Sequence, residues 1–180
     1  AALDATGNGH DASVHSAMPS RDRSGTDSGA LVLDGEEDYL ITGSENLLDG
    51  MEQGTISLWF RPDSLPETAN LLTYSTDQTA NSLWTLSTKS DSIRISYKYE
   101  GLSTPVLITE PAVSVGKWHH LAVVADGANP VQVLLNGVSL PVIVDPRSTN
   151  ATGSEWFADV SDVNSFDHFI MFGAFRREGT

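Results

Sequence analysis

The sequence contains no cysteine, and this absence removes several kinds of site at once. Disulfide bonds, thiolate zinc sites and cysteine nucleophiles all need a thiol, so none of them can occur in this chain. The compartment stays open, because a chain without cysteine fits a secreted or surface bacterial domain as well as a cytosolic protein.

Positive charge is scarce. The 180 residues include 10 Lys and Arg against 24 Asp and Glu, which gives a formal net charge of −14. Nucleic-acid binding needs a basic surface, so we expect no nucleic-acid partner. An anionic membrane surface is unfavourable for the same reason. The acidic surplus either serves solubility or supplies carboxylates to a hard cation such as calcium.

Long apolar runs and long helical patterns are also missing. No run is long enough to span a bilayer, so we expect no membrane insertion. No helical pattern of the length that a parallel α/β fold needs between its strands is present. The chain instead alternates short apolar segments with turn residues, spaced by roughly 8 to 12 residues. This spacing predicts an all-β fold, an antiparallel sandwich of about 10 to 13 strands in a single domain.

The strongest strand signal lies in residues 116–124, Gly-Lys-Trp-His-His-Leu-Ala-Val-Val, which are rich in aromatic and β-branched side chains. A turn cluster follows at 126–130, then a second apolar strand at 131–135 that ends in Asn136-Gly137. A third short strand follows this Asn-Gly pair, so the region predicts a β-meander.

Alternation along two other segments predicts which side chains share a face. In residues 55–61, one face holds Ile56, Leu58 and Phe60, and the other holds Ser57, Trp59 and Arg61. In residues 92–99, the isoleucines and tyrosines share one face, and Arg94, Ser96 and Lys98 occupy the other. Residues 16–29 are polar and predict a surface loop, whereas 154–164 predict a short amphipathic turn packed on the sheet.

Four stretches resemble one known family. Residues 117–124 with Val-Leu-Leu-Asn-Gly-Val at 133–138 look like the central hairpin of laminin-G-like jelly rolls, which belong to the concanavalin A-like lectin/glucanase superfamily. Asp-Ala-Thr-Gly-Asn-Gly at 4–9, the segment 30–40 and Thr-Ile-Ser-Leu-Trp-Phe-Arg-Pro at 55–62 resemble further motifs of that family, in the family's order. The resemblance covers roughly the first 145 residues and implies a concanavalin A-like jelly-roll sandwich.

The resemblance also implies a structural calcium ion. Many relatives hold calcium near the opening turn, near an Asp-Gly turn and by an Asp of the final strand. Asp4 and Asn8 match the opening turn, and Asp34 with Gly35 matches the Asp-Gly turn, so these four residues are the predicted calcium ligands. The final-strand ligand has no counterpart here, and a simple network of Asx-type turns is the alternative.

The family usually has one strand before the opening turn and one after the stretch that ends here at Gly173. This chain starts three residues before that turn and ends seven residues after Gly173. We therefore expect residues 1–180 to form one laminin-G-like domain without its first and last family strands. A sheet that lacks an edge strand exposes unpaired backbone, so a second chain or an adjoining domain is a predicted partner.

Catalytic signals are weak. Glycosidases of this superfamily carry alternating carboxylates on one strand, and retaining chemistry needs two carboxyl groups ~5 Å apart. Asp34, Glu36 and Asp38 alternate in this way, but the glycine between them predicts a solvated or cation-binding turn. His119 and His120 are adjacent on a strand and therefore point to opposite faces, so we expect structural roles for them. No catalytic residue is predicted.

Sugar-binding surfaces place aromatic rings beside hydrogen-bonding groups. Trp59, Arg61 and His120 fit this pattern best and are the predicted ligand-binding residues. We expect a non-catalytic binding module of an extracellular or cell-surface protein, of bacterial type, whose ligand is a glycan or a partner protein. Two alternatives stay open: a glycoside hydrolase or polysaccharide lyase of the same superfamily, and a purely structural or assembly domain.

Overall fold

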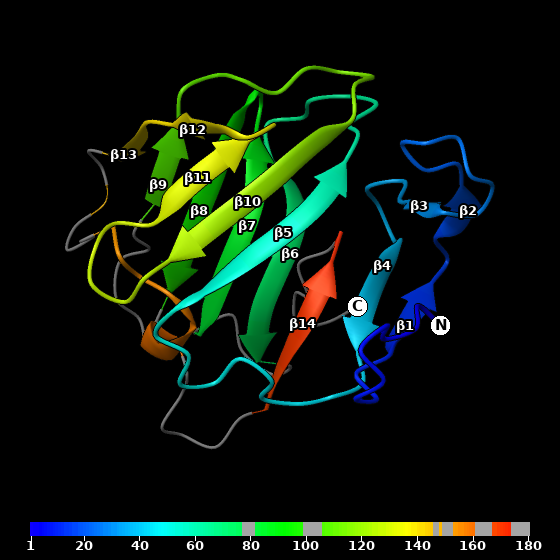
Figure 1. Cartoon of the computed structure of the whole chain (residues 1–180), viewed down its shortest axis with the longest axis horizontal. Helices are drawn as coiled ribbons and strands as arrows, with labels where there is room; N and C mark the ends of the chain where they lie inside the picture. The colour runs from blue at the N-terminus through cyan, green and yellow to red at the C-terminus, as the bar shows by residue number, and fades with distance from the viewer. Residues whose placement is uncertain (77–81, 99–105, 146–147, 149–152, 161–166, 174–180) are drawn as a thin grey trace.

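The computed structural model describes residues 1–76, 82–98, 106–145, 148, 153–160 and 167–173, and apart from one 3-10 turn the regular structure of these residues consists of antiparallel strands. Two sheets stack as a sandwich, and Figure 1 shows the smaller sheet in front of the central strands of the larger one. The predicted all-β antiparallel sandwich is confirmed. The described residues contain fourteen strands, one more than the predicted range.

The larger sheet has eight strands in the order β1-β4-β14-β6-β7-β8-β9-β13. Its strands are β1 (Ala12–His15), β4 (Tyr39–Thr42), β14 (His168–Phe172), β6 (Ala69–Thr76), β7 (Leu83–Lys89), β8 (Ser92–Lys98), β9 (Val106–Thr109) and β13 (Val142–Val144). All neighbouring strands within this sheet pair antiparallel. β1 and β14, which are far apart in the sequence, both pair with β4.

The smaller sheet has four strands in the order β12-β11-β10-β5. They are β12 (Val138–Leu140), β11 (Gln132–Leu135), β10 (His119–Ala125) and β5 (Gly54–Phe60). The strands β10, β11 and β12 follow one another and form the predicted meander, with Asn136 and Gly137 both at positive φ in the last turn. Asn-Gly is the pair that tolerates this turn geometry best.

A separate two-stranded hairpin corrects one prediction. Residues 16–29 were predicted to be a surface loop, but β2 (Met18–Ser20) lies within them and pairs with β3 (Ala30–Val32). Leu31 and Val32 of β3 are exposed, because β3 pairs with β2 beside the sandwich (Figure 1) instead of entering its core.

The core lies between the two sheets and follows the predicted alternation. In β5 and β10, inward and outward side chains alternate residue by residue, and Leu58 pairs with the fully buried Leu121. Trp84 of the larger sheet packs edge-on against Trp156, with their ring centroids 5.2 Å apart. Trp156 precedes η1 (Phe157–Asp159), a 3-10 turn that packs on the core. It confirms the turn predicted within residues 154–164 as far as Val160, and residues 161–164 lie outside the described residues.

No helix in the described part of the chain is long and apolar enough to cross a membrane. Tyr97 packs against the core with the isoleucines of β8, as the predicted shared face requires.

A substitution at Leu121 tests how much the sandwich core stabilises the fold. Replacing this fully buried side chain by Ala removes packed methyl groups and leaves a cavity, so Leu121→Ala should lower the free energy of unfolding by about 2–5 kcal/mol. Val138 is 64% exposed, and Val138→Ala should change the same quantity by about 0.5 kcal/mol or less. Urea denaturation followed by tryptophan fluorescence measures both, and equal effects would contradict the assigned core.

Candidate functional site

The outer face of the smaller sheet carries a cluster of tryptophan, arginine and histidine side chains at the end where β5 finishes and β10 begins. Trp59 of β5 is paired with His120 of β10, and the same register sets Arg61 opposite Trp118 just beyond the paired strands. Arg23, from the loop between β2 and β3, reaches the same cluster. These five residues, Arg23, Trp59, Arg61, Trp118 and His120, are called the tryptophan patch below.

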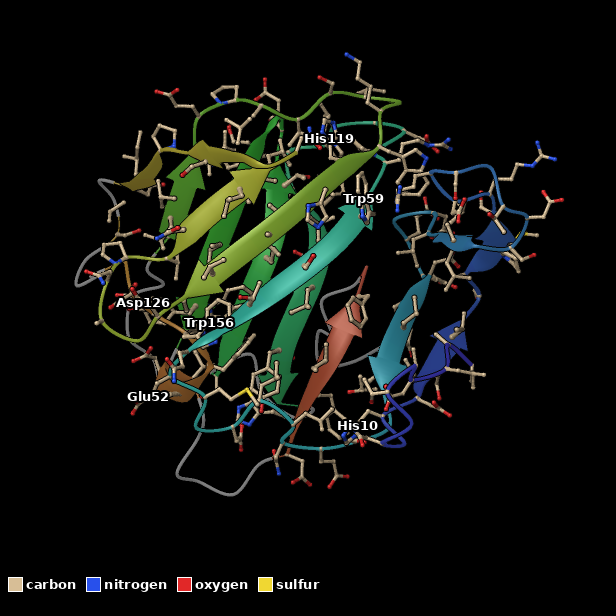
Figure 2. The ribbon with its side chains drawn as sticks, in the orientation of Figure 1. His10, Glu52, Trp59, His119, Asp126 and Trp156 are labelled. Atoms are coloured by element: carbon tan, nitrogen blue, oxygen red, sulfur yellow. The ribbon has the colours of Figure 1, made fainter. Side chains whose placement is uncertain are left out.

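Trp59 is the most exposed of the tryptophans that the structure describes. Its side chain is 47% exposed, whereas Trp84 and Trp156 are buried in the core. Figure 2 shows Trp59 near the end of β5 and Trp156 near the start of that strand. The ring centroids of Trp59 and His120 lie 5.0 Å apart, and the guanidinium carbon of Arg23 lies 4.5 Å from the centroid of the Trp59 ring. A cation over an indole face is attracted by the ring quadrupole, which holds Arg23 against Trp59.

Arg61 forms a second cation–π contact in the patch. Its guanidinium carbon lies 5.7 Å from the ring centroid of Trp118, and its Nε lies 3.6 Å from the carboxylate of Asp63. The Arg61 side chain is partly exposed, so both interactions are screened by water and leave its N–H donors available to a ligand.

Hydrogen bonds to residues on either side of β10 hold His120 in place. Its Nε2 lies 2.8 Å from the Ser57 hydroxyl on the outer face, and its backbone N–H donates to Oδ1 of Asn136 at 2.9 Å. His119 points inward and is buried, with Nδ1 3.1 Å from Nδ2 of Asn136 and Nε2 3.1 Å from the carbonyl oxygen of Ser114. The prediction that the two histidines face opposite sides is confirmed.

The patch therefore offers one exposed indole surface beside two guanidinium groups and an imidazole. Indole rings stack on the apolar faces of flat or ring-shaped ligands, and guanidinium groups donate to hydroxyl, carboxylate and phosphate oxygens. The structure brings together the three predicted ligand-binding residues, Trp59, Arg61 and His120. Sequence reasoning missed Arg23, because no local pattern indicates that the β2–β3 loop folds over β5.

The predicted calcium ligands lie at two separate places. Ala12 of β1 pairs with Thr42 of β4 and His15 pairs with Tyr39, so the opening turn before β1 lies at the Thr42 end of β4. The Asp34–Asp38 turn directly precedes Tyr39 and lies at the other end. Asp4 and Asn8 are thus not brought to Asp34 and Gly35 in one site. The described residues contain no cluster of three or more His, Asp or Glu side chains that could hold a metal ion.

Both turns are instead held by carboxylates that accept backbone hydrogen bonds. The carboxylate of Asp4 accepts from the N–H and hydroxyl of Thr6 and from the N–H groups of Asn8 and His10. These bonds, led by the Thr6 hydroxyl, lower the pKa of Asp4 to about 2. Asp34 accepts from three N–H groups of its own turn, which lowers its pKa in the same way. Calcium binding stays a prediction.

The Asp34 turn also bears on the catalytic alternative. Asp34 donates its backbone N–H to the carboxylate of Asp38, and the Asp34 carboxylate accepts from the N–H of Glu36. A general acid needs a raised pKa, whereas the pKa of Asp34 is lowered by these bonds. The turn is a closed hydrogen-bonded unit, as expected from its glycine, and its geometry does not favour acid catalysis.

Comparison with known families gives a match over most of the chain. A model of the laminin G type, described as the concanavalin A-like lectin/glucanases superfamily, matches residues 34–169, which is well over half of the chain. A comparison with curated protein sequences gives no match.

Several solved structures share the fold at low sequence identity. The CBM40 of the Ruminococcus gnavus IT-sialidase, bound to alpha2,3 sialyllactose, has a TM-score of 0.54 and 19% identity, with 72% of this chain and 68% of that chain covered. A leech intramolecular trans-sialidase in complex with 2,7-anhydro-Neu5Ac has a TM-score of 0.53 and 20% identity, and the match covers 71% of this chain and 19% of that one.

A third similar structure belongs to a toxin. It is described with the statement that cell entry of botulinum neurotoxin type C depends upon interaction with two ganglioside molecules. Its TM-score is 0.60 at 14% identity, and the match covers 99% of this chain but only 42% of that one. At these identities, the three likenesses establish the fold alone.

The opening turn gives a pH-dependent prediction. The folded-state pKa of Asp4 is about 2, below its ordinary value of 3.8. The ionised carboxylate therefore stabilises the fold fully above about pH 4, and this contribution is lost as the pH falls through about 2. NMR titration of the Asp4 carboxyl carbon should give a midpoint near 2, and Thr6→Ala should move it upward because the Thr6 hydroxyl is the largest cause. A midpoint near 3.8 in the unmodified protein would contradict the turn geometry.

Proposed function

Because this chain belongs to the concanavalin A-like lectin/glucanases superfamily, we propose that it is a non-catalytic carbohydrate-binding module whose binding surface is the tryptophan patch. The observation that carries this proposal is Trp59. A half-exposed indole is unfavourable in water, yet Trp59 lies on the outer face of its strand, among groups that donate hydrogen bonds.

A pyranose ring suits this surface in two respects. Its C–H face stacks on an exposed indole, and its hydroxyl groups accept hydrogen bonds from guanidinium and imidazole N–H groups. Trp59 supplies the first kind of contact, and Arg23, Arg61 and His120 supply the second. A sugar that stacks on Trp59 replaces the Arg23 guanidinium on that ring, and the guanidinium then contacts the sugar directly.

Two arginines favour a sugar with an acidic group. The chain has a net charge of −14, so an anionic ligand is repelled by most of its surface and needs a local cationic site. Sialyllactose, which is named for the Ruminococcus gnavus module, is a carbohydrate of this kind. We therefore place carboxylated glycans first among the ligands, and we propose an extracellular or cell-surface location, where such glycans are displayed.

The catalytic alternative has less support. Carbohydrate-binding modules are among the similar structures, and the pKa of Asp34 is lowered by its hydrogen bonds, whereas a general acid requires a raised pKa. A glycoside hydrolase or polysaccharide lyase would also have to release shortened or unsaturated sugars, which a non-catalytic module does not.

A glycan array tests the proposed function with the protein and two variants. The wild-type protein should bind a defined set of glycans, and Trp59→Ala should weaken that binding by about tenfold or more, because it removes the stacking surface. Ile143→Ala provides a matched control, since this exposed apolar side chain belongs to β13 in the other sheet, and the substitution should leave binding unchanged. If Trp59→Ala binds glycans as the wild type does, the binding site lies elsewhere. If the wild-type protein binds no glycan either with calcium or with chelator, the proposed function is rejected.

Arg23 tests the preference for acidic sugars. Arg23→Gln removes the charge over Trp59 and should reduce the affinity for carboxylated glycans by about tenfold, because charge-assisted hydrogen bonds are lost, and reduce the affinity for neutral glycans less. Isothermal titration at two salt concentrations measures both affinities. An equal loss for both glycan classes would contradict a carboxylate contact.

We propose that a calcium ion binds at one of the two turns, of Asp4 or of Asp34, because the two turns lie at opposite ends of β4 and cannot share one ion. If an ion binds, millimolar calcium should raise the melting temperature by a few degrees relative to chelator, as a ligand of the native state does. Either Asp4→Asn or Asp34→Asn should then abolish the increase and thereby identify the turn. An identical melting temperature in both conditions would remove calcium from the mechanism.

A further inference from the structure

The carboxylate of Asp22 is the centre of the β2–β3 loop, which carries Arg23. Its Oδ1 accepts from the backbone N–H of Ser24 at 2.8 Å, from the Ser24 hydroxyl at 2.9 Å and from the N–H of Thr26 at 2.9 Å. The backbone closes the same loop, because the N–H of Asp22 donates to the carbonyl oxygen of Thr26 at 3.1 Å. Asp22 and Ser24 are the chain neighbours of Arg23, so this network fixes the backbone on both sides of it.

Gly29, at the far end of the loop, lies against the same carboxylate. A Cβ atom added at Gly29 would lie 2.7 Å from Oδ2 of Asp22 and 2.9 Å from its Cγ, which is closer than real side chains approach. Gly29 is not among the residues with positive φ, so a larger residue would disturb the carboxylate rather than the backbone conformation. Glycine at this position therefore leaves the space that the Asp22 carboxylate occupies.

The two carboxylates of this loop have different surroundings. The hydrogen bonds from Thr26 and Ser24 lower the pKa of Asp22, so its side chain is ionised at neutral pH and its hydrogen bonds are charge-assisted. Asp27 instead pairs with Arg21, whose Nε lies 2.7 Å from the Asp27 carboxylate, and both of these side chains are largely exposed. An exposed ion pair of this kind contributes little to the loop.

The position of Arg23 depends on this loop. Arg23 has a long and exposed side chain, and such a side chain samples many rotamers unless its environment selects one. Here its backbone is fixed by the Asp22 network, and its guanidinium carbon lies 4.5 Å from the centroid of the Trp59 ring. A group that is already ordered in the free protein loses less entropy when a ligand binds, and this raises the affinity for that ligand.

We propose that Asp22 is a positioning residue of the tryptophan patch. It holds the β2–β3 loop so that Arg23 lies over Trp59 before a glycan binds, and it thereby sets the preference for carboxylated glycans. This role rests on the proposed function, because it concerns the same binding surface. Asp22 acts through Arg23 and does not contact the ligand.

A carboxylate next to an arginine can also act only by neutralising its charge, and the two roles have opposite consequences. If Asp22 only neutralised charge, its removal would strengthen the binding of an anionic ligand. If Asp22 positions Arg23, its removal weakens that binding, although the protein becomes less negative. The direction of the change in affinity therefore separates the two roles.

Isothermal titration measures this direction with two probes, the carboxylated glycan that binds best in the array and the same glycan with its carboxyl group reduced to an alcohol. Asp22→Ala should weaken binding of the carboxylated probe by about three- to tenfold, because Arg23 must then be ordered during binding, and should affect the reduced probe less. Asp22→Asn keeps the Oδ1 acceptor and should retain most of the affinity.

Asp27→Ala is the matched control. It removes an equal charge from the same loop but only an exposed contact with Arg21, so it should not weaken binding of the carboxylated probe. Gly29→Ala provides a second test, because it displaces the Asp22 carboxylate without removing it, and it should weaken binding of the carboxylated probe as Asp22→Ala does.

NMR of the free protein tests the position of Arg23 without any glycan. The side-chain protons of Arg23 lie by the indole face of Trp59, so its ring current should shift their resonances upfield. Asp22→Ala and Gly29→Ala should move these resonances back towards their ordinary positions, and Asp27→Ala should leave them unchanged.

The positioning role is overturned if Asp22→Ala binds the carboxylated probe as well as the wild type or better, if it weakens both probes equally, or if the Arg23 resonances stay shifted in it. If the wild-type protein binds no glycan, the proposed function fails and a role of Asp22 in recognition fails with it. The NMR shifts then still decide whether Asp22 holds Arg23 over Trp59.

Discussion

The register between β5 and β10 is the constraint on which the rest of this structure depends. Because side chains alternate along both strands, one pairing sets Leu58 against Leu121 in the core and Trp59 against His120 on the outer face. A slip by one residue would exchange the two faces, burying Trp59 and exposing the leucines. On the outer face the Ser57 hydroxyl contacts Nε2 of His120, and on the inner face the ring of Phe60 packs against His119, so contacts on both faces support this register and fix the core and the tryptophan patch together.

Much of this could be predicted from the sequence, because alternation and turn chemistry are local. The inward set of β5, the meander around Asn136 and the opposite directions of His119 and His120 all follow from a period of two and an Asn-Gly turn. The laminin-G-like resemblance is also confirmed by the family match over residues 34–169. These features need no knowledge of which distant segments meet.

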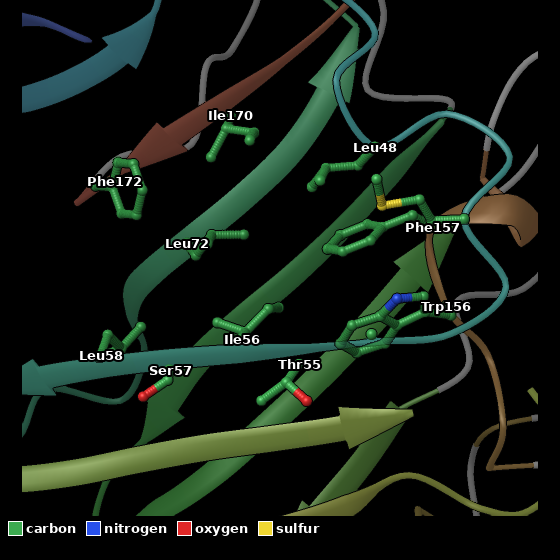
Figure 3. A pocket seen from close by; sticks show the side chains of 12 residues that line it. Leu48, Thr55, Ile56, Ser57, Leu58, Leu72, Trp156, Phe157, Ile170 and Phe172 are labelled. Carbon is green, nitrogen blue, oxygen red and sulfur yellow. The ribbon is translucent and has the colours of Figure 1, made fainter. Parts of the chain in front are cut away.

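The remainder depends on distant contacts. Arg23 reaches Trp59 only because the β2–β3 hairpin folds beside β5, and the polar composition of residues 16–29 predicted a loop there. The pairing of β1 with β4 separates the turns of Asp4 and Asp34, although both match motifs of one family site. Similarly, an apolar cleft beside β5 is lined by Leu48, Ile56 and Phe172 from segments far apart in the sequence (Figure 3), so no single segment could predict it.

The central claim is that Trp59 forms the binding surface while the core tryptophans do not. The chain has four tryptophans, and each gives a separate indole N–H resonance in a nitrogen-edited NMR spectrum. Titration with the best glycan from the array should shift the resonance of Trp59, and that of Trp118 beside it, while the resonance of the buried Trp84 stays in place. A saturating glycan that leaves the Trp59 resonance unmoved, or that shifts only the core tryptophans, would contradict the account.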